Sequence, residues 1–140
     1  VIRVGAEWWN FYSGYDGQTW HTGLAVASEP AQWTRRGKVL SPDGGSSWEG
    51  DYIAANGSAL ATVEPGKFQY WYQAGRVPRI GLAESTDGVN WKKRPAPVLN
   101  VGPRGSWDER GVADPYVFRP EGSDTIFMYY LGQDRARRVR

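Results

Sequence analysis

The densest group of ionisable side chains in the sequence lies in the stretch GSWDERGVADPYVF, residues 105–118. Asp108, Glu109 and Arg110 stand directly before an apolar run that contains one further carboxylate, Asp114. A carboxylate in such a run is costly to bury unless it is paired, hydrogen-bonded or open to a cavity. Carboxyl groups held on rigid elements can serve as general acid and general base, which makes this stretch the first candidate for chemistry.

The proline that follows Asp114 indicates which element holds this carboxylate. Pro115 lacks an amide hydrogen, so it suits the first residues of a strand or an edge position. We therefore expect a strand that begins at about Gly111 and presents Asp114 near its entry. The alternative is that Asp114 caps a turn before the proline. A weaker copy of the stretch further upstream favours the first interpretation.

That copy belongs to an internal repeat of about 58 residues, and a long fixed period of this kind indicates a repeat architecture. The segment GLAVAS at 23–28 recurs as GLAEST at 81–86, and Trp33 recurs as Trp91 at the same interval. Trp48 recurs as Trp107, after an interval that is longer by one. With the longer interval, Asp51 aligns with Arg110, and Ala55 aligns with Asp114. The second copy therefore lacks an acid at the position of Asp114.

Each repeat is predicted to contain four short strands. In the second repeat we expect them at about Tyr52–Ala55, Lys67–Gln73, Arg79–Ser85 and Trp91–Arg94, separated by turn signals that contain glycine. Four short strands per repeat are typical of β-propeller blades. We interpret residues 1–140 as a single partial β-propeller domain, with blade repeats at about 1–50 and 51–109 and an incomplete third at 110–140. Propellers need four or more blades to close, so we expect either a homo-oligomer or missing blades supplied by another chain.

The composition supports an all-β chain and excludes several kinds of partner. Eighteen Gly, nine Pro and 14% aromatic residues, eight of them Trp, favour many turns and strands. The net charge is only +2, and the basic excess lies mainly in the last six residues, so no nucleic acid partner is expected. No apolar run approaches the length of a membrane span. The chain has no cysteine and no recognisable signal peptide, and it starts at Val1 without Met, so the compartment stays undetermined.

Three motifs resemble the five-bladed β-propeller glycosidases, namely glycoside hydrolase family 43 and the related fructosidase-type families. They are the DPYV sequence at 114–117, the MYYLG and FYSG sequences at 128–132 and 11–14, and the Gly-Leu-Ala segment followed by STDGVNW at 85–91. The last motif is also similar to the Asp-box turn of sialidases, one residue short. The resemblance implies a partial five-bladed propeller whose innermost strands bring carboxylates to the ring axis, with Asp114 placed as one of them.

This resemblance implies glycoside hydrolysis, which needs one protonated carboxyl group and one ionised carboxylate. Our hypothesis is that Asp114 is the base or an acidity modulator and that Glu109 or Asp51 is the acid. Arg110 would keep one carboxylate ionised. The alternative is that residues 108–110 form an exposed loop with surface ion pairs of little energy.

Aromatic side chains are the second class of candidate, because sugars stack on flat rings. Trp9, Trp20 and His21 are predicted to contact substrate together with Arg110, whereas the recurring tryptophans are expected to pack between blades. The alternative for His21 is a structural histidine or an exposed polar contact. One histidine and no cysteine argue against a transition-metal site, and no cofactor is expected. The rival to an enzyme that acts on an oligosaccharide is a non-catalytic partial propeller that binds carbohydrate or protein.

Overall fold

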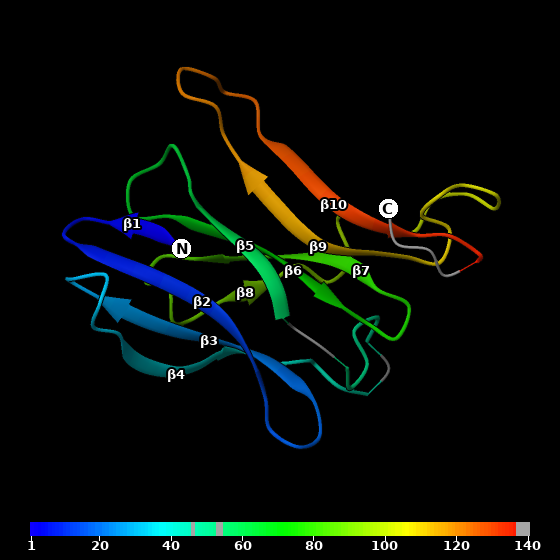
Figure 1. Ribbon diagram of the computed structural model, residues 1–140, viewed down its shortest axis with the longest axis horizontal. Coiled ribbons are helices and arrows are strands. Elements are labelled where there is room, and N and C mark those ends of the chain that lie inside the picture. Colours follow the sequence, from blue (N-terminus) through cyan, green and yellow to red (C-terminus); the bar gives the residue numbers. More distant parts are fainter. Residues whose placement is uncertain (46, 53–54, 137–140) are drawn as a thin grey trace.

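The computed structural model describes residues 1–45, 47–52 and 55–136, and all regular secondary structure in these ranges is β-strand (Figure 1). The strands are β1 (Ile2–Val4), β2 (Glu7–Tyr15), β3 (Trp20–Ala27), β4 (Thr34–Leu40), β5 (Ala55–Ala61), β6 (Phe68–Ala74), β7 (Arg79–Ser85), β8 (Lys92–Lys93), β9 (Gly111–Phe118) and β10 (Phe127–Gln133).

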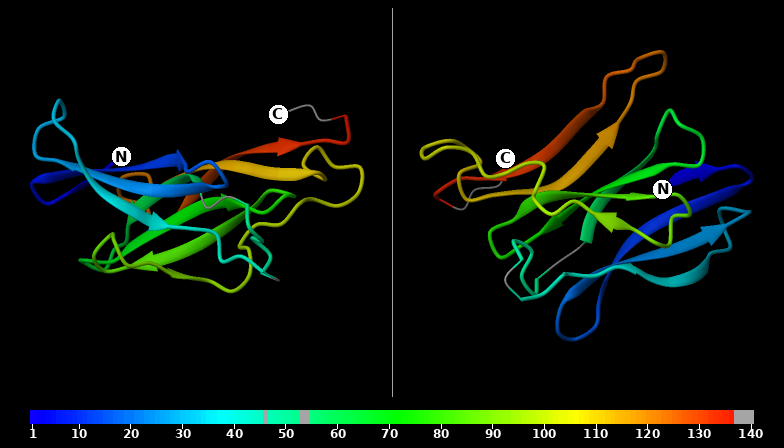
Figure 2. Two further views of the ribbon diagram at one scale, coloured as in Figure 1. Left: turned by 90° about the horizontal axis from the view of Figure 1, so that it is seen from below. Right: turned by 180° about the vertical axis from the view of Figure 1, so that it is seen from behind.

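The strands form three antiparallel sheets, each from consecutive segments of the chain. The orders are β1-β2-β3-β4, β5-β6-β7-β8 and β9-β10. We call them the first blade, the second blade and the third hairpin. The second blade lies between the other two sheets, with the first blade on one side and the third hairpin on the other (Figures 1 and 2). The predicted all-β fold of four-stranded antiparallel propeller blades is confirmed.

The predicted strand positions are mostly close to the observed ones, with one error. β7 spans Arg79–Ser85 and β9 begins at Gly111, both as predicted. The first strand of the second blade was expected at Tyr52–Ala55, yet β5 runs from Ala55 to Ala61. The prediction was wrong because Asn56-Gly57 reads as a turn signal, whereas the structure accommodates it as an irregularity inside a strand. Residues 53 and 54 of the expected strand lie outside the described residues.

Two apolar clusters join neighbouring sheets, and the alternation of side chains along β6 explains both. Tyr70 and Tyr72 face the first blade, where they pack with Phe11 and Leu40. Trp71 points to the opposite side of the sheet, as successive strand residues do. It packs there against residues of the third hairpin that include Val112, Val117 and Met128. The second blade is therefore buried on both faces.

Glycine at the start of each Gly-Leu-Ala segment makes room for a tyrosine from the neighbouring strand. A Cβ atom on Gly23 would lie 2.4 Å from the ring of Tyr12, and one on Gly81 would lie 2.5 Å from the ring of Tyr72. Contacts this short are forbidden, so the repeated glycine is explained by repeated packing of a tyrosine ring on backbone.

Candidate functional site

Two residues share an unusual backbone conformation, one on β5 and one on β9, the strands that we call the inner strands. Asn56 and Asp114 have φ angles of 45° and 47°, and they are the non-glycine residues with positive φ in the described ranges. Each lies at a register shift, because the pairing of β5 with β6 slips between Ala55 and Ser58 and the pairing of β9 with β10 slips opposite Asp114. The interval between the two positions equals that between the Gly-Leu-Ala segments, so they are equivalent β-bulges.

This equivalence corrects the alignment made from sequence. The counterpart of Asp114 in the second blade is Asn56, whereas the sequence alignment placed Ala55 there. The connecting loop is one residue longer before β5 than before β9: eight positions separate Trp48 from Asn56, and seven separate Trp107 from Asp114. A register taken from the tryptophans is therefore off by one residue at the inner strand.

The preceding sheet holds both bulges in place. The Ser13 hydroxyl in β2 accepts a hydrogen bond from the Asn56 amide at 3.0 Å and donates one to Asn56 Oδ1 at 2.9 Å. Gln73 in β6 accepts from the Asp114 amide through Oε1 at 3.2 Å. Ser13 and Gln73 are themselves equivalent, because each directly follows the tyrosine that packs on a glycine.

Asp114 combines this strained backbone with an available carboxylate. Its side chain is exposed, and within the described part of the chain it has no hydrogen-bond or ion-pair partner. A non-glycine residue in the left-handed region costs on the order of 1–3 kcal/mol and persists only where its surroundings enforce it, which is common at functional sites. Asp114 and Asn56 together define the candidate inner-strand site.

Glu109 and Asp51 lie in the loops that precede the inner strands, and each faces an arginine. Glu109 accepts from the Gly105 amide at 2.7 Å and pairs with Arg135 at 3.2 Å. Asp51 is exposed and lies 3.7 Å from Arg76. Among the described residues, no hydrogen bond or ion pair joins either carboxylate to Asp114. Their catalytic role stays a prediction.

Arg110 is exposed, and its amide donates to the carbonyl of Gln133 at 2.9 Å. It forms no ion pair with Asp114 within the described ranges. Four residues of extended strand correspond to about 13 Å, which explains why the expected contact is missing.

Of the two candidate tryptophans, one is exposed and the other is packed. Trp20 is 38% exposed and lies beside Tyr15, with ring centroids 5.3 Å apart. Trp9 is half-buried, and its ring centroid lies 5.0 Å from that of Phe68 in the second blade. Trp20 therefore offers an open ring, whereas Trp9 lies in the contact between blades.

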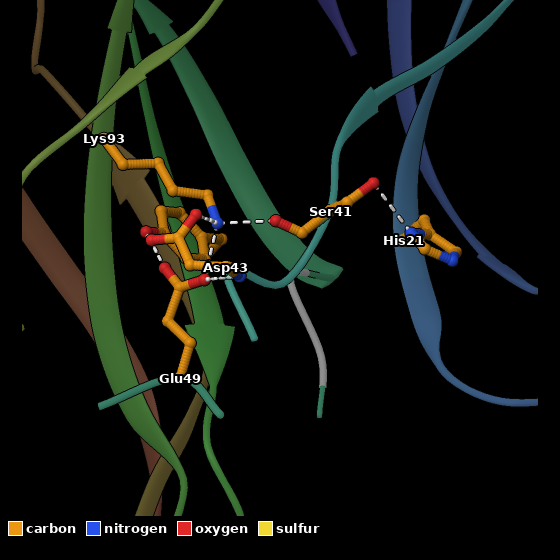
Figure 3. A network of polar contacts seen from close by, with 6 residues as sticks. His21, Ser41, Asp43, Glu49 and Lys93 are labelled. Atoms are coloured by element: carbon orange, nitrogen blue, oxygen red, sulfur yellow. Dashed lines mark hydrogen bonds and ion pairs between the residues drawn. The ribbon is translucent and has the colours of Figure 1, made fainter. Parts of the chain in front are cut away.

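His21 is buried and bonded through both ring nitrogens. Nε2 lies 2.7 Å from Asp16 Oδ2, and Nδ1 lies 2.9 Å from the Ser41 hydroxyl. Figure 3 shows the contact between His21 and Ser41. Hydrogen bonds from the amides of Thr19 and Gln18, followed by the contact with His21, hold the pKa of Asp16 well below its usual range. The ionised Asp16 fixes the orientation of the imidazole, so the histidine ties the β2–β3 turn to the end of β4.

Sequence analysis missed a buried network centred on Lys93 (Figure 3). Its ammonium group contacts Glu49 Oε2 at 2.5 Å, Asp43 Oδ1 at 2.8 Å and the Ser41 carbonyl at 2.5 Å. The Tyr72 hydroxyl donates to the other oxygen of Glu49 at 2.5 Å. Burial, together with the neighbouring Glu49 carboxylate, raises the pKa of Tyr72.

The third hairpin repeats part of this network. The Tyr130 hydroxyl donates to Asp108 at 3.2 Å, and Trp107 stacks on Tyr130 as Trp48 stacks on Tyr72. The signal was present in the sequence as Trp-Glu at 48–49 and Trp-Asp at 107–108. These carboxylates serve the packing of each sheet.

No group of three or more His, Asp or Glu side chains in the described ranges is arranged to hold a metal ion. Within the same ranges, no helix is long and apolar enough to cross a membrane.

No family model matches the sequence, and no match was found among curated proteins. Several solved structures are similar. Zg3597, a family 117 glycoside hydrolase of the marine bacterium Zobellia galactanivorans, matches 99% of this chain and 48% of its own, with a TM-score of 0.81 and 16% identity. Sucrose-6-phosphate hydrolase from Lactobacillus gasseri matches 94% of this chain and 27% of its own, with a TM-score of 0.72 and 17% identity.

An α-L-arabinofuranosidase from Lactobacillus brevis is similar over 95% of this chain and 44% of its own, with a TM-score of 0.66 and 15% identity. The chain has the fold of the propeller glycosidases, so the resemblance drawn from its motifs is confirmed for the fold. The chain spans about half or less of the length of each of these structures.

Proposed function

We propose that this chain forms part of a β-propeller that acts on or binds an oligosaccharide, with Asp114 as an acid–base group of the site. The observation that carries the proposal is the exposed carboxylate of Asp114, held in a strained conformation by a neighbouring blade. Support comes from the fold, because the structures similar to it include a glycoside hydrolase and a mannobiose phosphorylase.

Glycoside hydrolysis needs a second carboxyl group, about 5–5.5 Å from the first for retention and about 6.5–9.5 Å for inversion. Glu109 and Asp51 are the candidates in this chain. Each faces an arginine, and an arginine favours the ionised carboxylate. Either residue would have to leave that partner before it could donate a proton, and therefore Asp114 takes the leading role in the proposal.

Trp20 and Arg110 are proposed to contact substrate, and Trp9 and His21 to support that surface. Trp20 offers an exposed ring on which a sugar can stack, and Arg110 offers a guanidinium group at the loop before β9. Trp9 and His21 are more enclosed, so their role would be to hold the blade surface that carries the sugar.

A non-catalytic binding module is the second candidate, and Asn56 favours it. An amide stands where the third hairpin has a carboxylate, and an amide both donates and accepts hydrogen bonds, which suits sugar hydroxyl groups. In either case we propose that further blades, from another copy or another chain, complete the site.

The test uses the full chain with Asp114→Asn, which removes the charge and keeps a residue that tolerates positive φ. The exposed Asp124→Asn in the β9–β10 turn is the matched control. Aryl glycosides of arabinose, xylose and fructose-like sugars are assayed for hydrolysis, and oligosaccharide binding is followed by calorimetry. We expect Asp114→Asn to lower hydrolysis by roughly 100-fold or more and the control to match the wild type.

The remaining outcomes separate the two candidates. Binding without hydrolysis, weakened by Asn56→Ala, would support the binding module. Full hydrolysis by Asp114→Asn would remove Asp114 from the mechanism, and the lack of both hydrolysis and binding would refute the proposed function.

A further inference from the structure

The third hairpin exposes a continuous aromatic face. Tyr116 is 62% exposed, Phe127 47% and Tyr129 66%. Phe118 lies among them, with its ring centroid 5.7 Å from that of Phe127 and 5.6 Å from that of Tyr129, at interplanar angles of 21° and 18°. We call Tyr116, Phe118, Phe127 and Tyr129 the hairpin face. Aromatic surface gathered in this way marks an interaction site.

The positions of the hairpin face are covered where they recur in the first blade. Tyr12 is equivalent to Tyr72, because each packs on the glycine of a Gly-Leu-Ala segment. Tyr72 is in turn equivalent to Tyr130, because the hydroxyl of each donates to the acid of a Trp-acid pair. Phe127 and Tyr129, three residues and one residue before Tyr130, therefore correspond to Trp9 and Phe11.

In the first blade, these two positions make the contact with the second blade. The ring of Trp9 lies 5.0 Å from Phe68, and the ring of Phe11 lies 5.3 Å from Tyr70, centroid to centroid. Aromatic pairs at these distances stabilise a contact beyond the area that they bury. The hairpin face is therefore equivalent to the surface of the first blade that contacts the second blade.

A surface equivalent to the opposing side of this contact, which the second blade provides, lies on the side of the first blade that points away from the second blade. Trp8 and Asn10 alternate with Trp9 and Phe11 along β2, so they lie on the opposite side of the sheet. They stand four and two residues before Tyr12, as Phe68 and Tyr70 stand before Tyr72. We call Trp8, Asn10 and Tyr12 the first-blade face. Arg3 lies over Trp8 at 4.9 Å, and the Tyr12 hydroxyl has no hydrogen-bond partner in the described part of the chain.

We propose that a second copy of this chain docks head to tail, with Phe127 and Tyr129 of one copy against Trp8 and Asn10 of the other. The first blade and the third hairpin lie on opposite sides of the second blade (Figure 1), so in the proposed dimer a two-fold axis along the ring would relate two copies of this contact. This proposal deepens the ring completion proposed above. A second copy is the occupant because both halves of the repeated contact lie on one chain.

Solution mass by light scattering and sedimentation, measured without sugar, tests the proposal on three full-length variants. Tyr129→Glu places a charge in the hairpin face, and Asn10→Glu places one in the first-blade face. Val63→Glu, at a residue 72% exposed in the β5–β6 turn, is the matched control. Circular dichroism confirms that each variant is folded. We expect wild type and control to be dimers of twice the 15.7 kDa chain mass, and each of the other variants to dimerise roughly 30-fold more weakly.

Mixing the two weakened variants distinguishes head-to-tail docking from other arrangements. An equimolar mixture regains one intact contact, between Tyr129 of one chain and Asn10 of the other, so dimer should reappear. Dissociation by Tyr129→Glu alone would mean that two hairpin faces pack on each other, and it would overturn the proposal. A monomeric wild type up to high concentration would also overturn it and would assign both faces to blades of another polypeptide. The mass is independent of catalysis, so failure here is distinguishable from failure of the proposed activity.

Discussion

Gly81 illustrates how a single residue sets the packing of a blade. The Tyr72 ring lies directly over its Cα, and the edge of Trp48 approaches from the same side, so an added Cβ would lie 2.5 Å from one ring and 2.9 Å from the other. The Tyr72 ring cannot move freely, because its hydroxyl is bonded to buried Glu49. The glycine is therefore required by space rather than by backbone conformation.

We predict that Gly81→Ala lowers the free energy of unfolding by about 1–3 kcal/mol, the usual effect of overpacking a core. Gly14→Ala is the matched control, because its added Cβ would meet the Tyr12 ring at an ordinary 3.9 Å. Urea denaturation of both variants measures the difference. Equal stability of the two variants would show that Tyr72 can shift.

Sequence analysis singled out Asp114, which lies on β9 as predicted, and it did not recognise Asn56 as the equivalent residue of β5. Asp114 was found because a carboxylate beside proline in an apolar run is unusual. Asn56 was missed because a one-residue difference in loop length moved the alignment to Ala55. Only the φ angles and the register of the bulges show which residues correspond.

At the scale of elements, β8 holds the segment between β4 and β5 in place, in addition to the hydrogen bonds within that segment. Lys93 in β8 contacts Ser41, Asp43 and Glu49 of this segment, and its side chain is only 12% exposed, while that of Glu49 is fully buried. A short strand of two residues thus fixes a long connection. Removing one partner of a buried pair leaves the other charge uncompensated.

We predict that Lys93→Met destabilises the fold by about 3–5 kcal/mol, because Glu49 loses its counter-ion in a buried position. Lys92→Met, at the exposed neighbour in the same strand, should change stability by no more than about 0.5 kcal/mol. Thermal and urea unfolding compare the two. If the loss has this origin, adding Glu49→Gln to Lys93→Met should restore part of the stability.

Alternating apolar residues and glycine turns predicted most of the strands, since these are local signals. The Lys93 network could not be predicted in the same way. It joins segments that lie far apart in the sequence through a connection without regular strand structure, and no local pattern records which lysine turns inward. The repeated Trp-acid pairs were visible in the sequence, but their tyrosine partners are identified only by the fold.

At the scale of the whole molecule, stability depends on contacts between sheets. Tyr70 lies at the contact of the first and second blades, with its ring tilted against that of Phe11, and its hydroxyl accepts a weak hydrogen bond from Thr22 at 3.4 Å. Burial raises the pKa of Tyr70 to about 12, partly opposed by hydrogen bonds from Thr22 and Gly57. The folded state therefore keeps this phenol neutral at a pH at which the unfolded chain ionises it.

The raised pKa of Tyr70 makes the fold less stable at alkaline pH. A raised pKa stabilises the fold fully below the unfolded value of about 10, and this stability is lost as the pH rises through 10 toward 12. We predict that Tyr70→Phe makes the alkaline fall in unfolding free energy shallower, by up to about 1.4 kcal/mol per pH unit in this range. Denaturant titrations from pH 8 to pH 12 measure the slope, with Tyr15→Phe, which removes an exposed hydroxyl, as control. Identical slopes for wild type and Tyr70→Phe would contradict the assignment.

The Trp48-Glu49 pair has a consequence for how the chain can be divided. It precedes β5 in sequence, yet it packs on Tyr72 in β6 and binds Lys93 in β8. The part of the chain before the Gly50–Asp51 bond is therefore attached by side-chain contacts to the part after it. A protease cut at this bond would yield two fragments that stay associated and co-elute. The same bond is a natural junction for split-reporter designs or circular permutation, because the attachment between the halves does not depend on the peptide bond.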